Sequence, residues 1–253
     1  MIKLENISAG YNNITKLNNL NAAFEEGKIT CIIGPNGCGK TTLLNVIAKL
    51  IKPYLGKIYI NNTDISLIPH RDFSKLVSFF PQTRSVPSIT VESLVSHGRF
   101  PYLSFPRKLS VNDKEIIQYA MEVTGIESYK KRYVAELSGG ERQKVYLAMV
   151  ISQDTDIVIL DEPTTYLDIG QQFEIMNLIK ELNNHNKTII MVLHDISHAL
   201  NFSDYVCLMD NGNIKCVEKS DDLFDSGYID DVFKVKSNRI KTSLANHYFF
   251  CEK

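Results

Sequence analysis

The chain has 253 residues, of which 44% are hydrophobic and 23% charged, and its formal net charge is −1. This length allows one large domain or two small ones around a sizeable core. Nucleic-acid-binding proteins usually show a basic excess, so we expect no nucleic-acid partner. The five cysteines are scattered without CxxC spacing. This pattern favours reduced thiols in the cytoplasm over a zinc site or a disulfide framework.

The sequence shows neither a signal peptide nor a membrane-spanning segment. Lys3, Glu5 and Asn6 lie where a signal peptide would be apolar. No stretch approaches the roughly 18 apolar residues of a membrane helix. If the protein works at a membrane, another chain must therefore supply the span.

Strand-like patterns dominate the first part of the chain. Three short apolar segments predict strands, at residues 2–7, 22–24 and 29–33. The third is a continuous run rich in β-branched side chains, which is typical of a buried strand. Tyr11 follows Gly10 in a predicted loop.

The next residues carry the motif on which the rest of the interpretation depends. They are Gly34, Pro35, Asn36, Gly37, Cys38, Gly39, Lys40, Thr41 and Thr42, and they fit the P-loop pattern G-x-x-x-x-G-K-[ST]. The glycines permit a tight turn whose backbone N–H groups cradle phosphate oxygens. Lys40 supplies positive charge for the β- and γ-phosphates, and the Thr41 hydroxyl can ligate Mg²⁺. Apolar residues at helical spacing follow until Pro53, so a helix N-terminus would face the phosphates.

The middle of the chain changes from strands to helices. Strands are predicted at residues 56–62 and 77–80, and helices around residues 91–95 and 116–123. Between the two helices, residues 98–106 form a loop rich in aromatic residues and proline. This loop is either a packed connection or an exposed docking surface, and the sequence leaves both interpretations open.

A glycine pair opens the next predicted helix. Ser138 and Glu141 have the spacing of a capping box, with Gly139 and Gly140 between them. A capping box does not require two glycines. Glycines at a helix N-terminus expose backbone N–H groups, so we expect a second anion-binding site here as well as capping.

Two further predicted apolar strands end in residues whose side chains can take part in catalysis or bind a metal. Residues 157–160 lead to Asp161 and Glu162, and residues 188–193 lead to His194. Ligands of α/β sheets bind at the carboxyl ends of the strands. We therefore expect Asp161 to orient Mg²⁺ through water, Glu162 to polarise an attacking water, and His194 to face the ligand.

The remaining segments predict a helix with apolar residues between 173 and 182 and a hairpin over residues 205–217. The chain from residue 218 has no clear pattern. No repeat or linker interrupts the sequence, so we expect one domain with two lobes.

This ordered set of motifs resembles the ATP-binding subunits of ABC transporters over essentially the whole chain. The set consists of Tyr11, residues 34–42 (Walker A), Gln82 (Q-loop), residues 137–141 (signature), residues 157–162 (Walker B), Asp168 (D-loop) and His194 (switch histidine). A signature followed by a Walker B that ends in Asp-Glu is specific to this family. Within the family, residues 90–102 and 161–169 are similar to importers of iron–siderophore complexes, haem or vitamin B12, with the iron–siderophore type closest.

The resemblance implies an α/β fold of P-loop NTPase type. It consists of a RecA-like core with an antiparallel β subdomain and an inserted helical lobe. The core lobe would cover about residues 1–84 and 156–217, the helical lobe about residues 85–155, and a C-terminal tail residues 218–253.

The resemblance also implies roles for individual residues. Tyr11 would stack on adenine, and Thr41, Gln82 and Asp161 would serve Mg²⁺. Two copies would bind head to tail, with ATP between the P-loop of one and Ser138, Gly139, Gly140 and Glu141 of the other. Catalysis would fall to Glu162, His194 and Lys40.

The implied setting is the cytoplasmic face of the cell membrane, where the chain would bind a transmembrane permease and serve an extracytoplasmic substrate-binding protein indirectly. Hydrolysis of ATP would drive uptake of the iron complex. An alternative is a soluble ABC ATPase, such as an iron–sulfur assembly ATPase. The stretch from Thr90 to Tyr102 favours the importer, and Glu162 with His194 argues against a non-hydrolysing scaffold.

Overall fold

The computed structural model describes residues 1–12, 14–82, 86–242 and 246–253. The chain divides into two compact units, the first made of residues 1–67 and 188–253 and the second of residues 68–187. The boundary expected between the lobes, at residues 84/85, lies outside the described residues, so the division into lobes stays a prediction. Within the described part of the chain, none of the helices combines the length and the hydropathy needed to cross a membrane.

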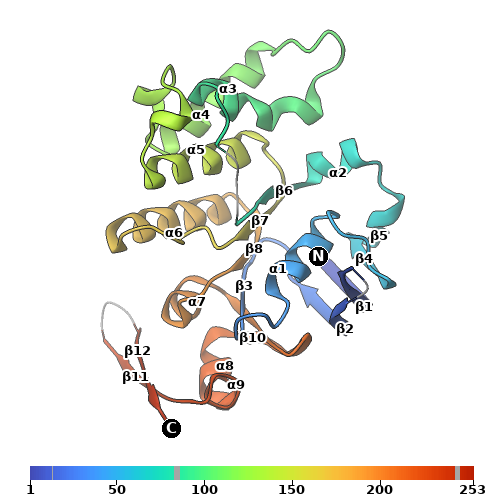
Figure 1. The fold of residues 1–253 in the computed structure, drawn as a ribbon, viewed down its shortest axis with the longest axis vertical. Coiled ribbons are helices and arrows are strands. Elements are labelled where there is room, and N and C mark those ends of the chain that lie inside the picture. The colour runs from blue at the N-terminus through green and yellow to red at the C-terminus, as the bar shows by residue number, and fades with distance from the viewer. Residues whose placement is uncertain (13, 83–85, 243–245) are drawn as a thin grey trace. The chain divides into compact units, whose positions relative to one another are not determined.

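The first unit combines antiparallel and parallel strands, a two-stranded C-terminal hairpin and several helices (Figure 1). Its first stretch contains β1 (Ile2–Tyr11), β2 (Ile14–Phe24), β3 (Ile29–Ile33), α1 (Lys40–Ile47), β4 (Leu55–Ile60), β5 (Thr63–Asp64) and η1 (Ile65–Leu67). Its second stretch contains β8 (Thr188–Val192), α7 (Ile196–Phe202), β9 (Tyr205–Asp210), β10 (Asn213–Lys219), α8 (Ser220–Ser226), α9 (Tyr228–Phe233), β11 (Val235–Lys241) and β12 (Asn246–Glu252). All the strands predicted in these stretches are confirmed, although β1 extends to Tyr11, which the sequence placed in a loop.

The strands of this unit pair in two different patterns. One sheet has the order β2-β1-β4-β5 and is antiparallel. In the other, β9, β3 and β8 run parallel, and β10 pairs with β9 as an antiparallel hairpin. Every residue of β3 and β8 is buried. Parallel strands are covered on both faces, which explains why these two read as uninterrupted apolar runs.

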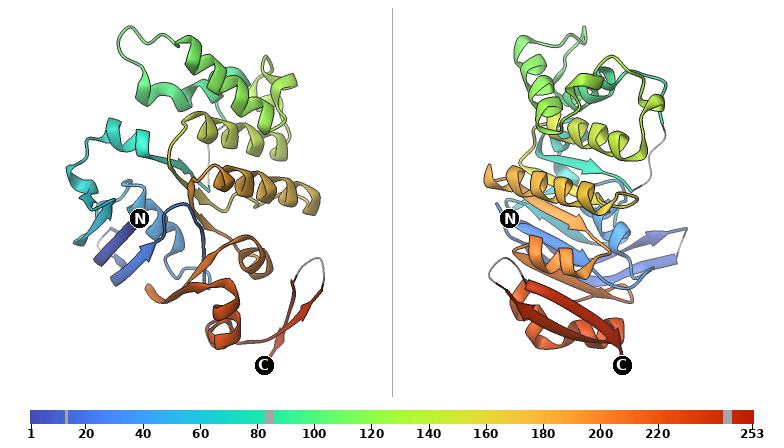
Figure 2. Two further views of the ribbon diagram at one scale, coloured as in Figure 1. Left: turned by 180° about the vertical axis from the view of Figure 1, so that it is seen from behind. Right: turned by 90° about the vertical axis from the view of Figure 1, so that its left-hand side faces the viewer.

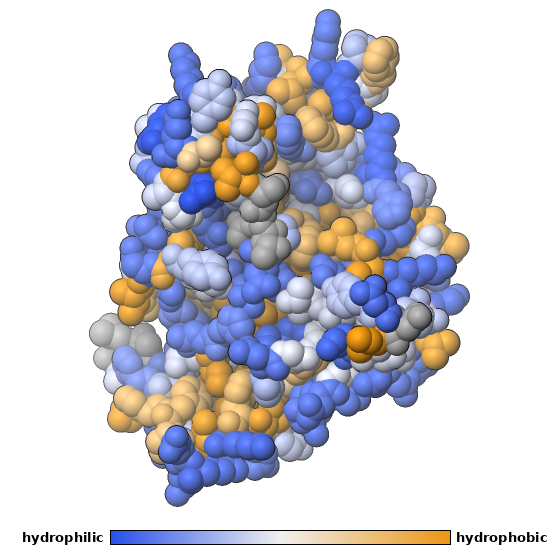
Figure 3. Space-filling view, in the orientation of Figure 1, coloured by the Kyte–Doolittle hydropathy of each residue, from blue (hydrophilic) through white to orange (hydrophobic). Residues whose placement is uncertain are grey.

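The last part of the first unit has ordered structure that the sequence did not predict. After α8 and α9, strands β11 and β12 form an antiparallel hairpin, drawn in red in Figure 2. Arg239 of β11 pairs with Asp221 and Asp225 of α8. Ile240 and Phe249 are more than half exposed on this hairpin. Figure 3 shows apolar patches among hydrophilic ones at the bottom of the view, where these C-terminal elements lie.

The second unit is mainly helical. It contains α2 (His70–Leu76), β6 (Val77–Phe80), α3 (Val91–Ser96), η2 (His97–Tyr102), α4 (Val111–Val123), η3 (Glu127–Tyr129), η4 (Val134–Glu136), α5 (Gly139–Ser152), β7 (Ile157–Asp161) and α6 (Ile169–Asn184). Strands β6 and β7 pair in parallel. Helices α3, α4 and α5 pack together through apolar side chains at helical spacing, as predicted, and lie side by side in Figures 1 and 2.

The aromatic segment at residues 98–106 is a loop only in its second half. Its first half is the 3-10 helix η2. Gly98 and Arg99 are buried, whereas Phe100 is 45% and Phe105 97% exposed. The segment is therefore packed at Gly98 and Arg99 and exposed at Phe100 of η2 and Phe105 of the loop, while its role as a docking surface stays a prediction.

Helix α4 begins with a capping box. The Ser110 hydroxyl accepts a hydrogen bond from the Asp113 N–H at 3.1 Å, and the Asp113 carboxylate accepts one from the Ser110 N–H at 2.9 Å. Burial alone would raise the pKa of Asp113, but hydrogen bonds from Ser110 and Arg99 outweigh it and lower that pKa. The carboxylate therefore stays charged at the start of the helix, where the helix dipole favours negative charge.

We predict that Ser110→Ala lowers the free energy of unfolding by about 1 kcal/mol, because the first turn of α4 loses its side-chain acceptor. Denaturant unfolding of the purified chain measures this. Ser110→Thr keeps the hydroxyl and should change the free energy by only a few tenths of a kcal/mol. Equal unfolding midpoints for Ser110→Ala and the parent would contradict the prediction.

Candidate functional site

The P-loop lies between β3 and α1, and its backbone needs glycine at two points. Gly34 has φ +156°, and a Cβ there would lie 2.3 Å from the carbonyl oxygen of Met209. Gly39 has φ +106°, and a Cβ there would lie 2.8 Å from a methyl carbon of Leu17. These positions fix the path of the loop, because a side chain would both strain the backbone and collide with the neighbouring strands.

The side chain of Lys40 folds back onto the backbone of the P-loop. Lys40 is buried, and its Nζ donates hydrogen bonds to the carbonyl oxygens of Gly34 at 2.7 Å and Pro35 at 3.0 Å. Gly39 is the N-cap of α1, and no side chain caps that helix. Backbone N–H groups at a helix start and an adjacent ammonium group together favour an anion. The arrangement is therefore suited to phosphate.

The other side chains of the loop are small or neutral. Thr41 is half-buried at the first turn of α1, Thr42 is buried, and Asn36 and Gly37 are exposed at the tip. Burial raises the pKa of the Cys38 thiol, even though Lys40 acts in the opposite direction. A protonated thiol adds no negative charge to a loop whose geometry is suited to an anion.

His194 lies at the same edge of the sheet as the P-loop. Strands β3 and β8 are parallel, with Ile29 opposite Ile189 and Ile32 opposite Val192. The residues that follow each strand therefore emerge together. His194 is exposed there, directly before Asp195, whose side chain caps α7.

Tyr11 differs from its predicted setting. It is the last residue of β1, and its hydroxyl accepts a hydrogen bond from Nδ2 of Asn45 on α1 at 3.0 Å. Its side chain is 43% exposed. The hydrogen bond fixes the ring relative to α1, the helix that starts in the P-loop, and leaves ring surface open to a flat ligand.

In the second unit, Gln82 and Glu162 meet directly. Parallel pairing of β6 and β7 brings the residues after each strand together. Nε2 of Gln82 donates to a carboxylate oxygen of Glu162 at 2.8 Å, and the Thr165 hydroxyl donates to the same oxygen at 3.0 Å. Glu162 has φ +52°, an uncommon value for a residue with a side chain, and it is only 6% exposed. Asp161, which precedes it, is 1% exposed at the end of β7.

The signature residues start α5 as the capping box predicted. The Ser138 N–H donates to Glu141 at 2.7 Å, and the Glu141 N–H donates to the Ser138 hydroxyl at 3.3 Å. These bonds to Ser138 lower the pKa of Glu141. Gly139 lies beside Gly140 at the start of this helix, with open space around the position of a Cβ.

The D-loop lies next to the signature. A Cβ on Gly140 would approach the side-chain amide of Gln171 to 2.5 Å, so glycine allows α6 to come close. Asp168 caps α6 by accepting from the Gln171 N–H at 2.9 Å. The structure thus brings signature and D-loop together within the second unit.

Four supporting residues were missed from the sequence. Thr165 holds Glu162, Asn45 holds Tyr11, Gln171 fills the space beside Gly140, and Gln143 of α5 donates to the Pro163 carbonyl oxygen. The role of Thr165 could have been predicted, because its hydroxyl lies only three residues after Glu162 in the sequence. The others act across elements that are distant in sequence and give no local pattern.

Comparison with known proteins agrees with this geometry. The sequence profile of the family described as ABC transporter matches residues 17–165. The iron(3+)-hydroxamate import ATP-binding protein FhuC of Bacillus subtilis is 41% identical over 215 residues, which cover 84% of this chain and 80% of that protein. The petrobactin import ATP-binding protein FpuD of Bacillus anthracis is 37% identical over 237 residues, covering 93% of this chain and 87% of that protein.

A solved structure extends the likeness to three dimensions. The dimeric post-hydrolysis state of the ATP-binding cassette MJ0796, bound to ADP and Pi, superposes with a TM-score of 0.77 and 29% identity, over 87% of this chain and 99% of that one. The expected P-loop NTPase fold of the ABC type is therefore confirmed. The chain belongs to the ATP-binding proteins of ABC transporters, a family of ATPases.

Proposed function

We propose that the chain is the ATP-hydrolysing subunit of an importer for iron–siderophore complexes. The relatives named above are ATP-binding proteins for the import of iron(3+)-hydroxamate and of petrobactin, which supports this cargo class. The observation that carries the hydrolytic role is the buried carboxylate of Glu162, held by Gln82 and Thr165 at the end of β7. The alternative of a soluble iron–sulfur assembly ATPase has no such support among these relatives.

ATP binding is assigned to the residues predicted from the sequence. The N–H groups of residues 34–42 and the Lys40 ammonium would hold the phosphates, and Tyr11 would stack on adenine. The open ring of Tyr11 and the buried Lys40 are consistent with these roles. Thr41, Gln82 and Asp161 offer hydroxyl, amide and carboxylate oxygens, the hard donors that Mg²⁺ prefers. Bound Mg²⁺ would neutralise phosphate charge.

Hydrolysis would depend on Glu162 and His194. Glu162 accepts two hydrogen bonds on one oxygen, which orients the carboxylate to accept a proton from the attacking water. His194 would hydrogen-bond the γ-phosphate and stabilise the charge that develops on it, together with Lys40. In this scheme Gln82 positions Glu162 through the bond that the structure shows.

A second copy of the chain would complete the ATP site. The capped start of α5, with Ser138, Gly139, Gly140 and Glu141, presents backbone N–H groups suited to the γ-phosphate of the partner's ATP. Asp168 would lie at the same dimer contact. The dimeric state of the related cassette supports a pair of copies, and the head-to-tail arrangement is part of the proposal.

The permease would bind at the exposed aromatic rings of this segment. Phe100 and Phe105 present apolar surface to solvent, whereas Arg99 is committed to the interior. Exposed aromatic rings are common anchors of protein interfaces. In this arrangement the chain works at the cytoplasmic face of the membrane, with a substrate-binding protein acting on the other side.

Glu162→Gln should retain ATP binding and lower turnover by about 100- to 10,000-fold, because the amide cannot accept the proton of the attacking water. Phosphate release and nucleotide binding are measured on the purified chain. Glu174→Gln, an exposed site on α6, serves as the matched control and should hydrolyse normally. Turnover at the parent rate in Glu162→Gln would remove Glu162 from catalysis.

Lys40→Ala should weaken ATP binding by about 10- to 100-fold, the loss expected when charge-assisted hydrogen bonds to phosphate disappear. Titration with a fluorescent ATP analogue measures the dissociation constant. Lys52→Ala removes an exposed lysine beyond the end of α1 and should bind like the parent. Unchanged affinity in Lys40→Ala would show that the P-loop does not hold the nucleotide.

Phe100→Ala combined with Phe105→Ala should lower transport by about tenfold, since interface anchors of this kind contribute at least 1–2 kcal/mol. ATPase activity of the isolated chain should stay at the parent level. Uptake of labelled iron–siderophore by cells carrying each variant gives the readout. Phe249→Ala, on the C-terminal hairpin, is the control. Full uptake in the double variant would place the docking surface elsewhere.

A further inference from the structure

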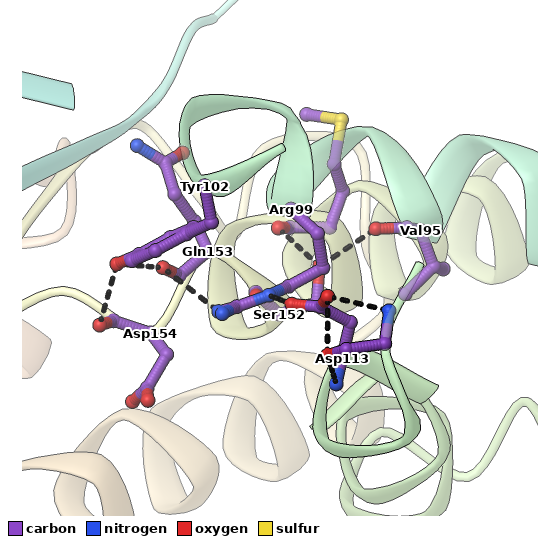
Figure 4. Close-up of polar contacts among 9 residues, drawn as sticks. Val95, Arg99, Tyr102, Asp113, Ser152, Gln153 and Asp154 are labelled. Atoms are coloured by element: carbon purple, nitrogen blue, oxygen red, sulfur yellow. Dashed lines mark hydrogen bonds and ion pairs between the residues drawn. The ribbon is translucent and has the colours of Figure 1, made fainter. Parts of the chain in front are cut away.

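A compact polar cluster joins the end of α5 to the aromatic segment and to α4 (Figure 4). At its centre is Arg99, which is 4% exposed. Its Nε donates to the Asp113 carboxylate at 2.9 Å, and its Nη1 donates to the carbonyl oxygen of Ser152 at 3.0 Å. One guanidinium group therefore binds both the start of α4 and the last turn of α5.

The aromatic segment has two further attachments to the same place. The Tyr102 hydroxyl donates to the Gln153 carbonyl oxygen at 2.9 Å, and the Arg99 guanidinium lies 3.9 Å from the centre of the Tyr102 ring. Gly98 packs so closely on α5 that a Cβ there would lie 2.2 Å from the Ser152 hydroxyl. Residues 98–102 therefore have no room to slide along the end of α5.

The same end of α5 is also fixed to the strand that leads to Gln82. The Gln153 side chain donates to the carbonyl oxygens of Ser74 at 2.6 Å and Val77 at 3.1 Å. Val77 begins β6, and Gln82 follows the end of that strand. Residues 152–153 thus form a junction between β6, α5 and the aromatic segment.

Arginine is suited to this junction for a physical reason. Its planar group offers several donors in fixed directions, so it can bind a carboxylate and helix-end carbonyl groups at once. A lysine carries one compact ammonium group, which could bind the Asp113 carboxylate or the Ser152 carbonyl oxygen but not both in the same directions. A positive charge at the C-terminal end of α5 is also favoured by the helix dipole.

We infer that Arg99 is a positioning residue that makes the aromatic segment move with α5 as one body. Displacement of the signature at the start of α5, caused by ATP, would then reach Phe100 and Phe105 through the helix and this junction. The inference rests on the proposed function, since it requires that ATP acts on the signature and that the aromatic rings dock a partner.

The test is hydrogen–deuterium exchange of the purified chain, in the Glu162→Gln background so that ATP is not consumed. In that parent, ATP should slow exchange about fivefold or more at residues 98–106 as well as at residues 138–145. Adding Arg99→Lys should reduce the response at residues 98–106 to less than about twofold and leave that at residues 138–145 intact.

Arg71→Lys is the matched control. Arg71 of α2 holds the same segment by donating to the carbonyl oxygens of Pro101 and Leu103, which lie outside α5. It should preserve the ATP response at residues 98–106. A general loss of stability would raise exchange in both segments without ATP, so it is distinguishable from a loss of coupling.

A full response of residues 98–106 in Arg99→Lys would overturn the inference, as would no response of that segment in the parent. If Arg99→Lys does not fold, Arg99→Gln carries the test, because its shorter planar amide cannot reach both the Asp113 carboxylate and the Ser152 carbonyl oxygen. An undiminished response there would overturn the inference too. If ATP changes exchange in no segment, including residues 34–42, the proposed function itself fails.

Discussion

The parallel pairing of buried strands is the constraint on which the rest of the structure depends. Parallel strands end at a common edge of a sheet, so the strand pairing alone brings the residues that follow them close together. β3 and β8 bring the P-loop and His194 to one edge, and β6 and β7 do the same for Gln82 and Glu162. Apolar burial along the strands thus determines where the polar chemistry lies.

The N-termini of three helices supply the other groups of the candidate site. α1 begins in the P-loop, α5 in the signature and α6 in the D-loop, and each presents backbone N–H groups at its first turn. Of these three helices, α5 and α6 have side-chain caps and α1 has none. The uncapped start of α1 is the one that holds a buried lysine, which fits a helix whose orphan donors bind phosphate.

Much of this could be predicted from the sequence because the signals are local. β3, β7 and β8 are continuous apolar runs, and the capping box at Ser138 needs only four residues. Arg99 could not be predicted as buried, since its partners Asp113 and Ser152 lie 14 and 53 residues away. The C-terminal hairpin was not predicted because residues 235–241 and 246–252 are mixed in polarity, although the two strands pair with each other.

The neutral thiol in the P-loop has a chemical consequence for the cell. Thiolates react with peroxides and electrophiles much faster than thiols do. Burial raises the pKa of Cys38, although the thiol lies two residues from an ammonium group that favours the thiolate. The reactive thiolate form is therefore disfavoured at the centre of the loop.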